Sequence, residues 1–198
     1  MTNMSEMSAM NRIQYNRENA VAPVDYLQEA GAIRPTDDET ELAFTDSFET
    51  RVHEHIERVE RPTESDVARI YSVDEADVSE MDRDYTAYKV IHTVYNWASE
   101  SALVFDIAAD RALREVTDWE SAVPPKQRAR MLKSLRSFQD ACFFCGGKII
   151  FNSEETAKSC CADMWVLTLH CGDCDRRFLE FSTEERGTAD AGLGGVGT

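Results

Sequence analysis

The chain has 198 residues, of which 37 are Asp or Glu and 21 are Lys or Arg, giving a formal net charge of −16. This length suits one ordinary domain with a small appended module, and a hydrophobic content of 42% supports a packed core, which excludes a wholly disordered chain. The acidity disfavours a broad nucleic-acid-binding face, because phosphate binding normally needs a basic surface. The first twenty residues are polar, and no apolar run approaches the roughly 20 residues that span a bilayer, so we expect a cytoplasmic protein without membrane contact.

The charge also indicates the solvent in which the protein works. Only five of the basic residues are lysines, and the carboxylates are spread along the whole chain. A carboxylate-rich surface that is poor in lysine stays hydrated in molar salt, where the Debye length falls to about 3 Å and self-repulsion is screened. The composition therefore predicts a protein of a salt-loving cell; an ordinary acidic protein is the alternative.

The N-terminal half is predicted to contain short helices and one β-hairpin. Residues 1–19 are polar and are expected to form a loose segment. Gly31 is a suitable stop for a helix over 22–30, and the acidic turn 37–40 predicts a hairpin near 32–45. A helix is predicted from Asp46 to about Glu60, because apolar side chains recur there on one face, at Phe48, Val52, Ile56 and Val59.

The middle of the chain is less regular. Residues 63–81 have the spacing of two short helices around a turn near 72–73, and 85–95 are rich in β-branched residues, which favours an extended segment. Ser99 is a candidate N-cap for a largely apolar helix that extends to about Val116 and is expected to be the most buried helix. Pro125 opens a further helix that leads directly into Cys142.

The C-terminal part carries the strongest motif, which consists of two Cys-x-x-Cys pairs separated by 25 residues. The ligands predicted from it are Cys142, Cys145, Cys171 and Cys174, and the intervening stretch is long enough for a β-hairpin. Gly146 and Gly172 follow the first pair and lie within the second, where tight turns are needed. Four thiolates complete a tetrahedral Zn²⁺ shell, which predicts one structural zinc per chain; a redox Cys-x-x-Cys or an iron–sulfur cluster is the alternative.

The predicted architecture is α+β, with a mainly helical body and a small C-terminal β zinc ribbon. The domain boundaries that we expect are a loose segment 1–19, a helical domain 20–141, a zinc ribbon 142–182 and a disordered tail 183–198. Cys160 and Cys161 lie between the ribbon strands. They are expected to pack as small buried side chains, with redox sensing as the alternative function.

The motif resembles that of uncharacterised haloarchaeal zinc-ribbon proteins. The resemblance rests on Cys-Phe-Phe-Cys-Gly-Gly at 142–147, on 154–161 and on Leu-His-Cys-Gly-Asp-Cys at 169–174, with further likeness at 97–104 and 132–138. The usual first knuckle of these proteins is Cys-Pro-x-Cys-Gly, so Phe143 stands where proline is common. The resemblance implies a zinc-ribbon fold and a bound metal, and it implies no particular activity.

Two segments offer a weaker nucleic-acid hypothesis. The segment 63–81 is spaced like a helix-turn-helix, but its second helix would carry four carboxylates toward phosphate, so a helical hairpin in the core is favoured. Residues 22–60 are similarly reminiscent of a winged helix with an acidic wing. The candidate basic face consists of Arg128, Arg130, Lys133, Arg136, Arg176 and Arg177.

The leading functional hypothesis is a non-enzymatic zinc-ribbon protein that serves as an interaction or regulatory module in a halophile, with transcription as the candidate setting. His53 and His55 are two apart on a helix and do not form an i, i+4 metal pair, and no catalytic triad, phosphate loop or small-molecule substrate site is evident in the sequence. We therefore expect a protein partner and no enzymatic activity. The alternatives are a DNA-binding transcriptional regulator and a thiol-based redox or metal sensor.

Overall fold

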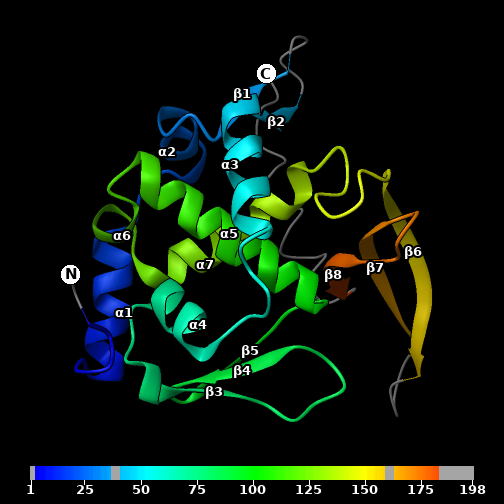
Figure 1. Ribbon diagram of the computed structural model, residues 1–198. Helices are drawn as coiled ribbons and strands as arrows, with labels where there is room; N and C mark the ends of the chain where they lie inside the picture. The colour runs from blue at the N-terminus through cyan, green and yellow to red at the C-terminus, as the bar shows by residue number, and fades with distance from the viewer. Residues whose placement is uncertain (1–2, 37–40, 159–162, 183–198) are drawn as a thin grey trace, which may run out of the picture.

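The computed structural model describes residues 3–36, 41–158 and 163–182, and for 153–158, 163–165 and 182 it describes only the backbone. A mainly helical body occupies one side of the molecule, and a three-stranded antiparallel sheet extends from its opposite side (Figure 1). This arrangement confirms the predicted α+β class with a small C-terminal β module. Among the described residues, no helix is both long and apolar enough to cross a membrane.

The N-terminal segment differs from the loose chain that we expected. It contains helix α1 (Ala9–Glu18), whose first turn is capped by the side chain of Ser8. No residue of α1 is buried, so its sequence shows no apolar stripe. Polar contacts dock the segment on the body instead: Asn16 accepts from the backbone N–H of Lys126 at 3.0 Å, and the N–H of Met4 donates to the carbonyl of Ser72 at 2.7 Å. Such contacts leave no periodic signal in the sequence.

The predicted helix, hairpin and helix that follow are all present. Gly31 has φ +66°, the left-handed conformation expected just after a helix. The hairpin pairs Ile33 with Phe44, and its predicted turn, 37–40, lies outside the described residues. Thr45 caps the next helix by accepting from the N–H of Phe48. These elements are α2 (Pro23–Glu29), β1 (Ile33–Pro35), β2 (Leu42–Phe44) and α3 (Asp46–Ile56).

The segment 63–81 contains only the first of its two predicted helices. Helix α4 (Glu64–Tyr71) begins at a capping box formed by Thr63 and Asp66 and ends at Ser72, which has φ +51°. The expected second helix is wrong, because a single 3₁₀ turn leads there into an edge strand of a small sheet. That sheet has the order β3 (Val78–Glu80), β4 (Ala87–Val90), β5 (Thr93–Asn96).

Helix α5 (Glu100–Val116) lies at the centre of the body, as predicted, with eleven buried residues. Ser99 caps it and also donates its hydroxyl to the carbonyl of Arg177 in the ribbon. Helices α3 and α4 pack around α5, as do α6 (Trp119–Ala122) and α7 (Pro125–Leu135). Helix α7 is followed by the 3₁₀ turn η2 (Arg136–Phe138).

The C-terminal sheet has its own small core. Its strands are β6 (Ile149–Lys158), β7 (Asp163–Cys171) and β8 (Arg177–Ser182), in the order β6-β7-β8, so β6 is an edge strand on the side away from the body (Figure 1). Leu169, Phe178 and Leu179 are buried together with two of the cysteines. The sheet thereby brings the ends of its strands to the helical body.

Candidate metal centre

The first cysteine knuckle lies in the loop between η2 and β6. The N–H of Gly146 donates to the carbonyl of Cys142 at 2.8 Å, and the N–H of Cys142 donates to the carbonyl of Gly147 at 2.8 Å. Gly146 has φ +73°, which side chains larger than hydrogen rarely adopt, so the turn needs glycine as the sequence predicted. This closed turn directs the thiols of Cys142 and Cys145 to the same side.

The second knuckle is the turn between β7 and β8. The N–H of Asp175 donates to the carbonyl of Cys171 at 3.0 Å. The N–H of Gly172 donates at 2.9 Å to the carbonyl of Lys148, which directly follows the first knuckle. A Cβ atom on Gly172 would lie 2.5 Å from Cδ1 of Ile150. Gly172 does not have a positive φ, and a side chain at this position would have to displace the end of the Ile150 side chain.

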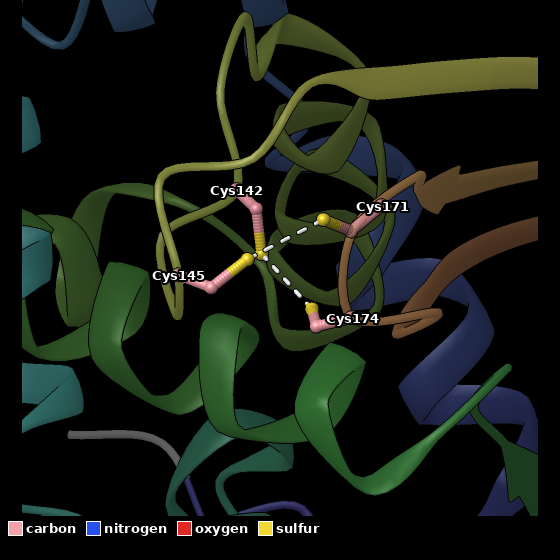
Figure 2. Close-up of side chains that lie close together, drawn as sticks. All are labelled: Cys142, Cys145, Cys171 and Cys174. Atoms are coloured by element: carbon pink, nitrogen blue, oxygen red, sulfur yellow. Dashed lines mark hydrogen bonds between the residues drawn. The ribbon is translucent and has the colours of Figure 1, made fainter.

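The two knuckles bring all four thiols together. The Sγ atoms of Cys142 and Cys174 are 3.8 Å apart, those of Cys145 and Cys171 are 3.5 Å apart, and all four lie within 4.8 Å of one another. Figure 2 shows the four side chains pointing toward one common point. The structure thus places the four cysteines that the sequence singled out around a single position.

These distances fit one metal ion. A tetrahedral ion with sulfur ligands at about 2.3 Å would hold its thiolates about 3.8 Å apart. A disulfide would need a sulfur–sulfur distance of about 2.05 Å, and all four cysteines are free. A multi-iron cluster would need the thiolates spread around several metal atoms. The donor set is soft and complete, so the site can hold a Zn²⁺-like ion without an open position for substrate.

The environment of the thiols is uneven. Cys142 and Cys171 are buried, whereas Cys145 is exposed. Burial raises the pKa of Cys142 to about 12. Burial also acts to raise the pKa of Cys174, but hydrogen bonds from the backbone and side chain of Arg176 outweigh it and lower that pKa to about 6. A bound cation would supply the charge that a buried thiolate at Cys142 requires.

The two phenylalanines of the first knuckle attach it to two different cores. Phe143 belongs to the core of the helical body, where its ring centroid lies 5.3 Å from that of Phe105 and 5.9 Å from that of Phe44. Phe144 stacks on Phe178 of the ribbon with 6.1 Å between ring centroids, and the central guanidinium carbon of Arg176 lies 5.0 Å from the centroid of the Phe144 ring. The Phe-Phe pair thereby joins the metal site to the body, a role that the replacement of proline by Phe143 did not reveal in the sequence.

A buried ion pair makes a second connection between body and ribbon. Arg136, 4% exposed, donates to both carboxylate oxygens of Asp106 and, at 3.1 Å, to the carbonyl of Phe178 in β8. The indole N–H of Trp97 also donates to Asp106, at 2.8 Å. The carboxylate is thus satisfied, and the ribbon backbone is anchored on α5.

The predicted basic face is therefore not formed as expected. Arg128 is fully buried and donates to the carbonyls of Ile70 and Glu120, while Arg136 is used in the ion pair with Asp106. Burial lowers the pKa of Arg128 to about 10, so it stays charged at neutral pH. Both arginines fill structural roles, because the carbonyl acceptors at the ends of α4 and in β8 are buried beside them.

The remaining candidates from the sequence have other places. His53 packs its ring 4.6 Å from Phe143, and His55 pairs with Glu115 through Nε2 at 2.9 Å, so the two histidines contact different neighbours. Cys160 and Cys161 lie outside the described residues, and their proposed sensing role stays a prediction.

Two family models match the chain. The central domain of a family of unknown function, DUF8054, matches residues 22–137, and the C-terminal domain of the same family matches residues 140–181. The chain belongs to the DUF8054 family. No curated protein and no solved structure matches it.

The boundary between the two DUF8054 matches lies between residues 137 and 140, just before the first knuckle. The four cysteines fall within the C-terminal match, and their structural partners Phe105, Asp106 and Arg136 fall within the central one. The description of the family gives no activity. Membership of the DUF8054 family does not test the resemblance to haloarchaeal zinc-ribbon proteins, which stays a prediction.

Proposed function

We propose that the chain is a non-enzymatic zinc-ribbon protein that serves as an interaction or regulatory module. One observation carries the proposal: four thiols converge on a single point and fill every position of a tetrahedral shell. A metal held in this way has no place for a substrate, so it stabilises a surface instead of activating a reactant. We propose Zn²⁺ as that metal, one ion per chain.

The surface that the metal would stabilise is the outer side of the ribbon. Strand β6 is an edge strand, and Phe151 and Ile150 on it are 60% and 40% exposed. Successive side chains of a strand point to opposite faces, so this edge offers apolar groups on both sides, together with a strand edge that pairs with no other described strand. Such an edge suits a partner protein that adds an extended segment.

The DNA-binding alternative has less support. The second helix of the predicted helix-turn-helix is replaced by strand β3. Two residues of the candidate basic face, Arg128 and Arg136, are buried. Transcription therefore enters the proposal only as a setting in which a partner protein would be found.

The metal part of the proposal is tested by purifying the protein without added metal and measuring its metal content. We expect about one zinc per chain and none in the Cys174→Ser variant. Stoichiometric iron would contradict zinc, and an intact ribbon in metal-free protein would contradict the structural role.

The interaction part is tested by crosslinked affinity purification of the tagged protein from its own cells at native salt, with both protein and DNA identified. We expect a defined partner that is lost with Phe151→Ser and retained with Tyr85→Ser, a matched exposed aromatic on the body. Enrichment of specific DNA without a protein partner would instead favour the DNA-binding regulator.

A further inference from the structure

A cleft in the helical body, lined by none of the ribbon residues, is the second candidate site of the molecule. It has a volume of about 480 Å³ and lies between α1, the β4–β5 hairpin and the first turns of α7. Pockets that hold small molecules usually have volumes of about 300–1,000 Å³. A neighbouring cleft of about 210 Å³ shares four of its lining residues, namely Tyr71, Tyr95, Lys126 and Arg130.

The charge of this cleft is opposite to that of the chain. Arg12, Arg17, Lys126 and Arg130 line the main cleft, and Lys133 lines its neighbour. None of the sixteen residues lining the main cleft is Asp or Glu, although nearly one residue in five of the chain is acidic. The cleft is thus a local cationic site in a strongly acidic protein, which favours an anionic ligand.

Several of these cations lack partners of their own. Within the described part of the chain, the side chains of Arg17, Lys126 and Arg130 form no ion pair or hydrogen bond, whereas six of the eleven other arginines between residues 3 and 141 pair with carboxylates. Arg12 is held in place by two backbone carbonyls, those of Met4 and Met7. Like charges gathered without counter-charges repel one another, and a bound anion would relieve that repulsion.

The cleft also offers apolar and aromatic surface. The rings of Tyr71 and Tyr95 lie 4.3 Å apart, centroid to centroid, and Tyr95 is the less buried of the two. Ile13 on α1 is 64% exposed and lines the cleft. A ligand that combines a flat or apolar body with an anionic group would match both kinds of surface.

The hairpin tip beside the cleft is strained. Ile91 has φ +55°, a conformation that β-branched residues rarely adopt, and its N–H donates to the carbonyl of Asp77 at 2.7 Å. The two-residue loop of Ile91 and His92 lines the cleft. Strain of this kind is found preferentially at binding sites, where it fixes the shape of the wall.

We propose that this cleft binds a small phosphate-bearing ligand of nucleotide type. Lys126, Arg130 and Arg17 receive the phosphate, and the ring lies against Tyr95 and Ile13. The site is separate from the cysteine cluster and does not depend on the metal. It adds ligand-dependent control to the proposed interaction module, because α7 forms one wall of the cleft and leads through η2 into the first knuckle.

The test is a calorimetric titration of the full, metal-loaded chain with AMP, GMP, CMP and UMP, with adenosine and inorganic phosphate as half-ligands. We expect at least one mononucleotide to bind about tenfold or more tightly than either half-ligand, because only it meets both surfaces. Absence of mononucleotide binding overturns the proposal, as does equal affinity for inorganic phosphate. Tighter binding of a single-stranded oligonucleotide than of any mononucleotide also overturns it, in favour of nucleic acid.

Variants locate the binding. The double variant Lys126→Gln/Arg130→Gln is expected to lose about tenfold or more in affinity. The control Arg83→Gln/Lys89→Gln removes the same charge from two exposed positions outside the cleft and should bind as the wild type does. Unfolding temperatures of both variants establish that each is folded. Equal losses in the two variants would show an unspecific charge effect and overturn the site.

Discussion

The helical body and the ribbon are stabilised in different ways. The described part of the body is built around a continuous core of 28 buried residues, one of which is Phe143 of the ribbon, whereas the core of the ribbon contains five, two of which are the cysteines Cys142 and Cys171. A module of about 40 residues seldom buries enough apolar surface to fold alone, so a metal or a neighbour has to supply the remainder. From this difference we expect the body to support itself, and the ribbon to depend on its four thiolates and on its contacts with the body.

Removal of the metal should separate the two regions most clearly. Cys171→Ser is expected to abolish metal binding and to unfold the ribbon, because structural Zn²⁺ contributes about 10 kcal/mol or more to the folding of such modules. Hydrogen exchange measured by mass spectrometry should show lost protection in β6, β7 and β8, with α5 still protected. Equal loss of protection in α5 would mean that the two regions fold as one unit.

The ion pair between body and ribbon should have the next largest effect. Arg136→Met leaves Asp106 charged and unpaired in the interior, which is expected to lower the free energy of unfolding by about 3–5 kcal/mol. Arg130→Met, at an exposed position of the preceding helix α7, is the control and should change little. Chemical denaturation measures both, and an Arg136→Met variant as stable as the control would contradict the role of the pair.

Phe143 tests how far the ribbon relies on the core of the body. Phe143→Ala is expected to cost about 3 kcal/mol, because it opens a cavity between Phe44 and Phe105. Phe144→Ala should cost less, since Phe144 is only partly buried. The metal content of both variants should stay at that of the wild type. Loss of metal from Phe143→Ala would show that the contact with the body also shapes the knuckle.

The smallest effect is expected from salt. Repulsion among the carboxylates of a chain with net charge −16 is screened as the Debye length falls from about 10 Å at 0.1 M to about 3 Å at 1 M. We therefore expect the unfolding temperature of the body to rise with KCl concentration. A temperature that stays constant or falls would contradict the prediction of a protein adapted to high salt.

Local patterns were enough to predict the elements whose own side chains determine them. The Cys-x-x-Cys spacing predicted which four residues meet at one point, and the apolar content of 99–116 predicted the central helix. Ser99 and Gly31 marked helix ends correctly, because capping and positive φ depend on the residue itself.

Other features were decided only by contacts between distant residues. Helix α1 is docked by polar contacts to residues far along the chain, and the second helix predicted near 75–81 is replaced by a strand because β4 is there to pair with it. The basic face lost Arg128 and Arg136 for the same reason, since their buried acceptors, Ile70 and Asp106, lie 58 and 30 residues away. The sequence by itself determined the metal-binding residues and the central helix through local spacing. The tertiary structure decided which charges are buried, which remain in the cationic cleft and how the ribbon is held, because these depend on partners that no local pattern records.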